Sequence, residues 1–190
     1  MKSLSLMCIL IFLVIATSSL SIKSKFTKKA TCTTTPQFNS NLWYKVYIIS
    51  DTGKGIARCN NCGQGSYPDS AAVHGNIGDS WAIWKLYPGC NGQVAIRSVD
   101  TNKYLARCNK CWKKAAYPDS AFVHATNPND SWAHWTMINN GDGTYSFKSD
   151  TGKYLARCNN CVTGGAKSDF AFVHATSNTG SWVRFKLVLA

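Results

Sequence analysis

The stretch Asp-Thr-Asn-Lys-Tyr-Leu-Ala-Arg-Cys-Asn-Lys-Cys at residues 100–111 returns as Asp-Thr-Gly-Lys-Tyr-Leu-Ala-Arg-Cys-Asn-Asn-Cys at residues 150–161. A related stretch, Asp-Thr-Gly-Lys-Gly-Ile-Ala-Arg-Cys-Asn-Asn-Cys, occupies residues 51–62. Each copy continues with Val-His and then Ser-Trp at a similar spacing. A period of about fifty residues is the signature of a repeated supersecondary unit. The sequence therefore predicts three copies, over about residues 41–91, 92–143 and 144–190.

Each copy reads as four short strands that are rich in aromatic and β-branched residues. In the third copy the predicted strands are 145–149, 153–158, 170–175 and 182–189. Asp-Thr-Gly-Lys separates the first two, and its glycine suits a hairpin turn. No helical periodicity of useful length follows the first 21 residues. An all-β domain over residues 41–190 is the expected fold class.

Three copies of four strands, the Ser-Trp that closes each copy and the Gly-Lys-Tyr-Leu-Ala step at 152–156 resemble the β-trefoil superfamily, which includes fascin-like, fibroblast-growth-factor-like and lectin members. The resemblance implies a barrel of strands capped by hairpins, which hides most sheet edges. A β-propeller or a solenoid is the weaker alternative, because three blades are fewer than the usual four to eight of a propeller. The closing tryptophans (Trp81, Trp132, Trp182) and the three repeated histidines (His74, His124, His174) are expected to be structural, with the tryptophans in the core.

The first 21 residues have the pattern of a secretory signal peptide: a basic residue, an apolar run at 6–16, then small residues. A membrane anchor is the alternative, but the run is shorter than the about 20 residues that span a bilayer. Residues 22–40, with four lysines and a threonine-rich end, are expected to form a basic arm. The prediction is a secreted, extracellular protein without a stable membrane span.

Eight cysteines remain after the signal peptide, and an even number in an exported chain favours disulfides. Six form one Cys-x-x-Cys pair per copy, and the predicted bonds are Cys59–Cys62, Cys108–Cys111 and Cys158–Cys161. The remaining two, Cys32 and Cys90, are expected to pair with each other. A zinc site and a thioredoxin-like redox motif are the alternatives; the first lacks a second histidine and the second lacks a helix. No metal and no cofactor are predicted.

The charge is strongly positive. Without the signal peptide, twenty basic and nine acidic side chains remain, a net charge of +11. On a secreted protein this favours an extracellular glycan or another anionic surface as partner, rather than nucleic acid. All nine acids are aspartates, and most of them, like most histidines, recur once per copy. Because a catalytic acid–base set is not expected three times over, the chain is predicted not to be an enzyme.

Binding residues are expected in two places. Tyr67 with Asp69 and Tyr117 with Asp119 combine an aromatic face with a carboxylate on a loop, as a sugar site needs, although Asp followed by Ser is also a common turn former. The third copy has Lys-Ser before Asp169, so that site would differ.

The second place is a loop in which one tryptophan stands among lysines. Trp112, Lys113 and Lys114 suit a sulfated glycan, an acidic protein or a membrane interface. The alternative is that Trp112 covers a neighbouring hydrophobic gap. Asn129 begins the clear N-glycosylation sequon of the chain after residue 21.

The predicted function is lectin-like recognition of extracellular carbohydrate, with anionic glycans among the candidates. Three similar units would give avidity for a repetitive ligand. The Gln-x-Trp ending of ricin-type lectins is absent, so the resemblance carries no sugar specificity. The alternatives are a structural or interaction protein of a matrix or coat, a protease inhibitor, and a basic membrane-active protein.

Overall fold

The computed structural model describes residue 38 and residues 41–190. The predicted signal peptide, nearly all of the predicted basic arm, and Cys32 lie outside the described residues.

The described chain is built from strands, so the all-β prediction is confirmed. The strands are β1 (Tyr44–Ile49), β2 (Gly55–Asn60), β3 (Asp69–Gly75), β4 (Trp84–Pro88), β5 (Gln93–Ser98), β6 (Tyr104–Asn109), β7 (Asp119–Ala125), β8 (His134–Asn139), β9 (Thr144–Lys148), β10 (Tyr154–Asn159), β11 (Asp169–Ala175) and β12 (Phe185–Leu189). Short 3-10 turns are η1 (Ser80–Ala82), η2 (Cys90–Gly92), η3 (Ser131–Ala133) and η4 (Ser181–Val183). In the third copy, three predicted strands match to within a residue, whereas β12 begins three residues late.

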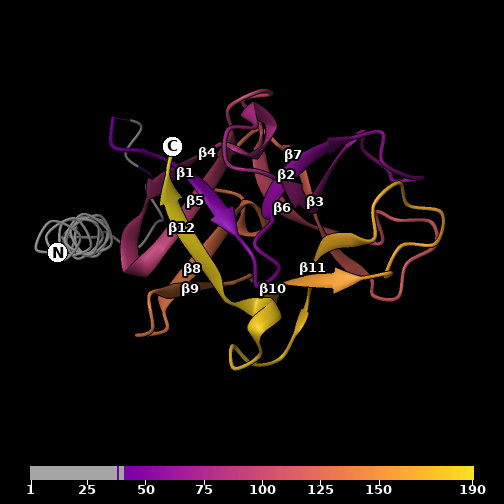
Figure 1. Ribbon diagram of the computed structural model, residues 1–190. Helices are drawn as coiled ribbons and strands as arrows, with labels where there is room; N and C mark the ends of the chain where they lie inside the picture. Colours follow the sequence, from indigo (N-terminus) through magenta and orange to yellow (C-terminus); the bar gives the residue numbers. More distant parts are fainter. Residues whose placement is uncertain (1–37, 39–40) are drawn as a thin grey trace, which may run out of the picture. The chain divides into compact units, whose positions relative to one another are not determined.

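Six strands close a ring by antiparallel pairing, in the order β1, β12, β9, β8, β5, β4 and back to β1. Figure 1 shows β1 and β12, from opposite ends of the described chain, side by side. Every strand of this ring has a hydrogen-bonded neighbour on both sides, so no edge of the ring is left open.

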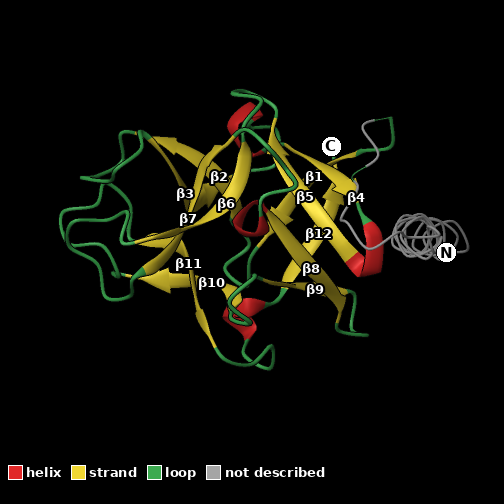
Figure 2. Cartoon of the chain, turned by 180° about the vertical axis from the view of Figure 1, so that it is seen from behind, coloured by secondary structure: helices red, strands yellow, loops and turns green. Residues whose placement is uncertain are grey.

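The remaining strands form three hairpins, β2–β3, β6–β7 and β10–β11, with the same register and the same register shift near their start. The hairpins touch one another through β3–β7, β7–β11 and β11–β3. Figure 2 shows them at one end of the strand assembly, with long loops at their tips. The hairpins thus cap one end of the ring, as a trefoil-like arrangement requires.

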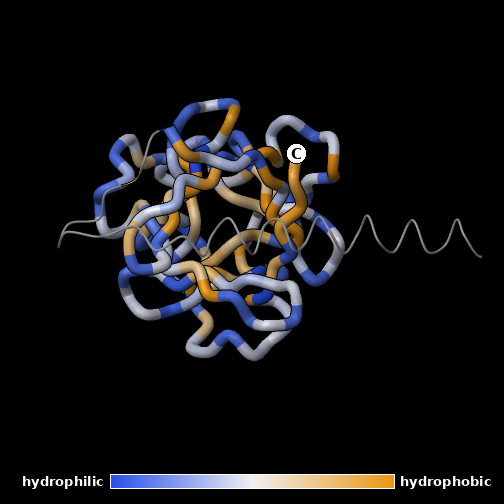
Figure 3. Tube along the Cα trace, turned by 90° about the vertical axis from the view of Figure 1, so that its left-hand side faces the viewer, coloured by the Kyte–Doolittle hydropathy of each residue, from blue (hydrophilic) through white to orange (hydrophobic). Residues whose placement is uncertain are grey.

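The core contains one large aromatic side chain from the start of the last strand of each sequence copy. Trp84, Trp135 and Phe185 are fully buried. The indole nitrogens donate to backbone carbonyl oxygens, Trp84 Nε1 to Ile56 at 2.8 Å and Trp135 Nε1 to Leu105 at 3.0 Å. Figure 3 shows the hydrophobic strand segments inside and hydrophilic segments at many of the outer loops.

The prediction that the closing tryptophans lie in the core is wrong. Trp81, Trp132 and Trp182 are 42%, 42% and 47% exposed. Each is the middle residue of a 3-10 turn, and the residue that follows it is buried. Because the strand begins only after this turn, the core position falls to the aromatic residue three places later.

Three arginines at equivalent positions join the sequence copies. Each binds an aspartate of its own hairpin through Nη1 and an aspartate of a neighbouring copy through the other side of its guanidinium. The three groups are Asp69–Arg58–Asp100, Asp119–Arg107–Asp150 and Asp169–Arg157–Asp51. The last group ties the third copy to the first across 106 residues of sequence. These arginines thus pair with the repeated aspartates and link the sequence copies.

The three predicted Cys-x-x-Cys disulfides are present at the ends of β2, β6 and β10. Cys90 is also disulfide-bonded; its predicted partner, Cys32, lies outside the described residues, so that pairing stays a prediction. The zinc interpretation is wrong for these six cysteines, because their sulfurs are bonded to each other. Within the described residues no group of three or more potential ligands could hold a metal ion.

Three loops at the hairpin tips, residues 60–68, 109–118 and 159–168, form what we call the hairpin cap. Each loop donates a backbone N–H to the carbonyl oxygen of the second cysteine of the next loop. These bonds run from Ser66 to Cys111 (2.7 Å), from Ala116 to Cys161 (2.9 Å) and from Ala166 to Cys62 (2.7 Å). The hydrogen bonds close a circle, so the disulfide-clamped loops hold one another in place.

Candidate functional site

The two predicted tyrosine–aspartate pairs are divided between surface and interior. Tyr67 is 43% and Tyr117 is 42% exposed. Their rings stack on histidines of the following hairpin, Tyr67 on His124 at 4.5 Å and Tyr117 on His174 at 4.3 Å between ring centroids. These tyrosines therefore connect hairpins and still present an aromatic edge to solvent.

The aspartates of these pairs are buried and hold their own hairpins. Asp69 Oδ1 accepts hydrogen bonds from Arg58 and Asn60, both at 2.9 Å. Asp119 and Asp169 accept the equivalent bonds, and Asp119 is only 7% exposed, as is Asp69. The expectation that Asp69 and Asp119 meet sugar hydroxyls is corrected by this burial, because both carboxylates already serve structural partners.

The expectation that Trp112 meets a ligand is also corrected, because this side chain is buried and only 8% exposed. Its ring packs against Phe122 and Phe170, with centroids 5.0 and 5.1 Å away. A Cβ on Gly63 would lie 2.8 Å from this ring, so the glycine makes room for it. The alternative interpretation of Trp112, as a cover for a hydrophobic gap, holds. Lys113 and Lys114 beside it are exposed.

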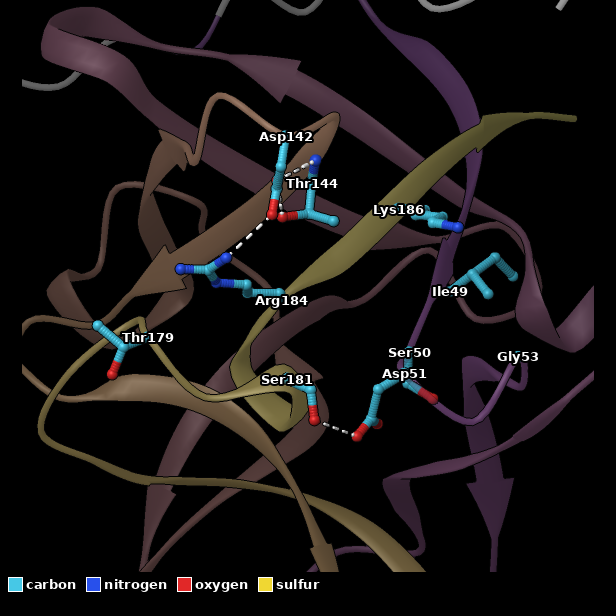
Figure 4. Close-up of a pocket in the computed structure, with 10 residues that line it drawn as sticks. All are labelled: Ile49, Ser50, Asp51, Gly53, Asp142, Thr144, Thr179, Ser181, Arg184 and Lys186. Carbon is cyan, nitrogen blue, oxygen red and sulfur yellow. Dashed lines mark hydrogen bonds and ion pairs between the residues drawn. The ribbon is translucent and has the colours of Figure 1, made fainter.

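A pocket of about 430 Å³ lies where the third sequence copy and the end of the second meet the first. It opens between the β8–β9 turn, η4 with the start of β12, and the β1–β2 turn (Figure 4). The lining residues are Ile49, Ser50, Asp51, Gly53, Asp142, Thr144, Thr179, Ser181, Arg184 and Lys186. Most of these side chains are polar, and hydroxyl, carboxylate, guanidinium and ammonium groups are all represented.

The polar groups on one side of the pocket are held by Asp142. Arg184 Nη1 bonds Asp142 Oδ2 at 2.9 Å, and the Thr144 hydroxyl and backbone N–H donate to Asp142 Oδ1. These hydrogen bonds, those from Thr144 first, lower the pKa of the Asp142 carboxyl. Figure 4 shows the three side chains joined in this way.

On another side Asp51 is the fixed group. It accepts hydrogen bonds from Arg157 Nε at 2.8 Å and from the Ser181 hydroxyl at 2.9 Å. The bond from Arg157 is the largest cause that lowers the pKa of Asp51. Lys186 is exposed at the rim. The pocket thus offers preoriented donors and acceptors, with both carboxylates ionised near neutral pH.

Some groups around this pocket recur in every copy, such as Asp51 and Ser181, and others break the threefold pattern. At the position of Arg184 the other copies have Ile83 and His134, and at the position of Gly180 they have Asp79 and Asp130. Asp79 Oδ2 closes its own loop by accepting the Asn76 backbone N–H at 2.8 Å, whereas the glycine cannot. Instead, the Trp182 ring covers Gly180, where a Cβ would lie 2.6 Å from it.

The sequence-based site prediction missed this pocket because its residues come from separate copies, which no local stretch of sequence brings together. Asp142 stands out in the sequence as an acid without counterparts in the other copies, and that is the signal that could have found the site. The sequon residue Asn129 is exposed and takes the position of Thr179 in the second copy. Its glycosylation stays a prediction.

The three histidines are half-buried, and their Nδ1 atoms are buried without a hydrogen-bond partner in the described structure. Burial is the main cause that lowers the pKa of each. Lys167, which replaces tyrosine in the third copy, adds to the lowered pKa of His74 through its charge. No helix in the described part of the chain is long and apolar enough to cross a membrane.

No protein-family model matches the sequence, and no curated protein is significantly similar to it. Solved structures do resemble it. They include the designed threefold-symmetric protein ThreeFoil (16% identity, TM-score 0.57, 77% of this chain and 99% of that one). A lectin of Polyporus squamosus, bound to a sialylated epitope, has 12% identity and a TM-score of 0.58 over 77% of this chain and 49% of its own.

A salivary protein of Culex quiquefasciatus from the cysteine- and tryptophan-rich family aligns with 86% of this chain and 99% of its own, at 14% identity and a TM-score of 0.53. Identities this low show the fold alone. With the ring of strands and the capping hairpins, they establish that this chain has a β-trefoil-type fold.

Proposed function

We propose that this protein is a secreted, lectin-like β-trefoil that binds extracellular carbohydrate in the pocket beside Asp142. In this proposal the three sequence copies are three units of four strands, and the site is formed by the first copy, the third copy and the turn that precedes the third. The observation that carries the proposal is the polar pocket, where two oriented carboxylates, an arginine and several hydroxyls face one space. The lectin among the structural neighbours supports it.

Sugar recognition needs such a set of groups because each sugar hydroxyl both donates and accepts hydrogen bonds. Charged partners make the stronger of these bonds. Asp142 and Asp51 supply acceptors, and Arg184 and Lys186 supply donors. Since existing hydrogen bonds fix Asp142 and Asp51, less side-chain freedom is lost when a ligand binds.

The same geometry supports binding rather than hydrolysis. A glycosidase needs one carboxylic acid that stays protonated near neutral pH, which requires a raised pKa. Both carboxyls in the pocket have lowered pKa values instead. One structural neighbour is an exo-β-1,3-galactanase, and the match covers 30% of that protein's chain. We expect no sugar release when the purified protein is incubated with a β-1,3-galactan.

A glycan array with the purified, oxidised protein tests the proposal, followed by calorimetry with the best glycan. Arg184→Ile introduces the residue that the first copy has at this position, and we expect it to abolish binding. His134→Ile makes the matching change in the second copy and should leave binding intact. If the array shows no binding, or if both variants bind like the wild type, the pocket is not a sugar site.

A second candidate is an extracellular interaction protein, favoured by the exposed Trp81, Trp132 and Trp182. Exposed tryptophans are frequent anchors of protein interfaces. An array without hits, together with loss of a partner's binding in a Trp132→Ser variant, would favour this function.

A further inference from the structure

We propose that the hairpin cap is a second binding surface, separate from the pocket, and that it takes a sulfated polysaccharide chain. The first observation is the charge. The three cap loops contain Lys110, Lys113, Lys114 and Lys167, and no aspartate or glutamate. All four lysines are exposed.

The acids nearest in sequence form no ion pair with these lysines in the described structure. Asp69, Asp119 and Asp169 follow the cap loops directly, but arginine and asparagine side chains of the hairpins occupy their Oδ1 atoms. In the described part of the chain every ion pair is made by an arginine. The positive charge of the cap is therefore available to a ligand.

The backbone beneath the central lysines is rigid. Lys113 N donates to the Gln64 carbonyl oxygen at 3.2 Å, and the Lys114 carbonyl oxygen accepts from Thr163 N at 3.1 Å. These bonds fasten the two lysines to the loops on both sides, and the buried Trp112 anchors them from below. A fixed platform spends less entropy on binding than a mobile tail does.

A small depression lies between these side chains and is lined by Gln64, Lys113, Lys114 and Thr163, with Trp112 and Val162 at its base. An amide, a hydroxyl and two ammonium groups can donate to the oxygens of one sulfate ester. The depression is too shallow to enclose a free ligand. It suits one group of a longer chain, whose other sulfates reach the lysines at the edge of the cap.

Burial of the apolar residues favours a polysaccharide over a lipid surface. A protein that binds membranes through a loop inserts apolar side chains below the headgroups. Here Trp112 is 8% and Val162 is 9% exposed, so the centre of the cap offers no such anchor. The exposed tyrosines of the cap loops, Tyr67 and Tyr117, are stacked on His124 and His174. The attraction is then electrostatic and weakens as salt screens it.

The test measures binding of the purified protein to dextran sulfate, with unsulfated dextran as control, at low and near-physiological salt. The double variant Lys113→Gln/Lys114→Gln removes two charges from the cap. Lys45→Gln/Lys54→Gln removes two exposed charges outside the cap, one in β1 and one in the β1–β2 turn, as a matched control. Because two of the four cap lysines are lost, we expect the cap variant to bind at least about tenfold more weakly and the control variant to change little.

Equal losses in the two double variants would overturn the proposal, because net charge alone would then account for binding. Binding to vesicles that contain phosphatidylserine, without binding to dextran sulfate, would overturn it in favour of a lipid surface. Arg184→Ile in the pocket should leave dextran sulfate binding unchanged, so failure of the pocket proposal and failure of this one give different results.

Discussion

Three different residues meet at the centre of the hairpin cap, Gly63, Trp112 and Val162, although they occupy equivalent positions in the three copies. One tryptophan fills a space that three symmetric side chains would otherwise share. Its ring lies against the Gly63 backbone, where a Cβ would come within 2.8 Å of Cζ3. We predict that Gly63→Val and Trp112→Val are each destabilising and that together they partly compensate.

The sizes follow from packing. Trp112→Val removes about 90 Å³ of buried side chain, which at about 24 cal/mol per Å³ of cavity amounts to about 2 kcal/mol; with the lost transfer energy the total is about 3–4 kcal/mol. Gly63→Val places its Cβ 2.8 Å from Cζ3 of the tryptophan ring and should cost about 1–3 kcal/mol as overpacking. In the double variant the new valine enters space that the indole has left, so we expect a coupling of at least about 1 kcal/mol.

Urea unfolding of the oxidised wild type, both single variants and the double variant measures these values as one double-mutant cycle. Thermal melting should show Trp112→Val lower by about 10 °C, at about 2–4 °C per kcal/mol for a domain of this size. Strict additivity of the two substitutions would refute the reasoning, because it would mean that the residues do not share one space. Ala116→Ser, an exposed change in the same loop, serves as the control and should alter stability little.

Three further predictions concern the charged groups. Arg107→Met should cost about 2–4 kcal/mol in urea unfolding and more than Arg58→Met, because Arg107 binds its interrepeat aspartate at 2.7 Å and Arg58 does so at 3.3 Å; equal costs would contradict this order. The pKa values of Asp51 and Asp150 are lowered, so their contribution to the free energy of unfolding is complete above about pH 4 and is lost as the pH falls through the lower folded values. The urea concentration at the unfolding midpoint should therefore fall between pH 5 and pH 2. A midpoint that does not change with pH would contradict the ion-pair assignment. Burial lowers the pKa of His124 below 6.5, so its contribution to the free energy of unfolding is present above that pH and declines as the pH falls through 6.5 toward the folded value. His124→Gln should flatten the plot of stability against pH between pH 7 and pH 5. An unchanged slope would contradict this prediction.

Much of the fold follows from local pattern. The fifty-residue period is visible when the copies are compared, and the hairpin turn Asp-Thr-Gly-Lys and the Cys-x-x-Cys pairs involve residues close together in sequence. The all-β class and the three local disulfides could therefore be predicted without coordinates. The same holds for three of the four strands in the third copy. Turn formation depends on residues a few positions apart, and the period is visible in the sequence itself.

The sites depend instead on which copies meet. Nothing near Trp81 shows that the core takes Trp84 in its place, since a 3-10 turn separates them and barrel closure selects the buried ring. From the sequence, Asp69 is a candidate ligand group, whereas in the structure the guanidinium of Arg58 binds its carboxylate. The pocket joins Asp51 to Asp142 and Arg184, residues about ninety or more positions apart, because β1 pairs with β12 when the ring closes. Such contacts between distant residues form only when the ring of strands closes. The repeat pattern of the sequence does not show which residues from different copies then lie side by side.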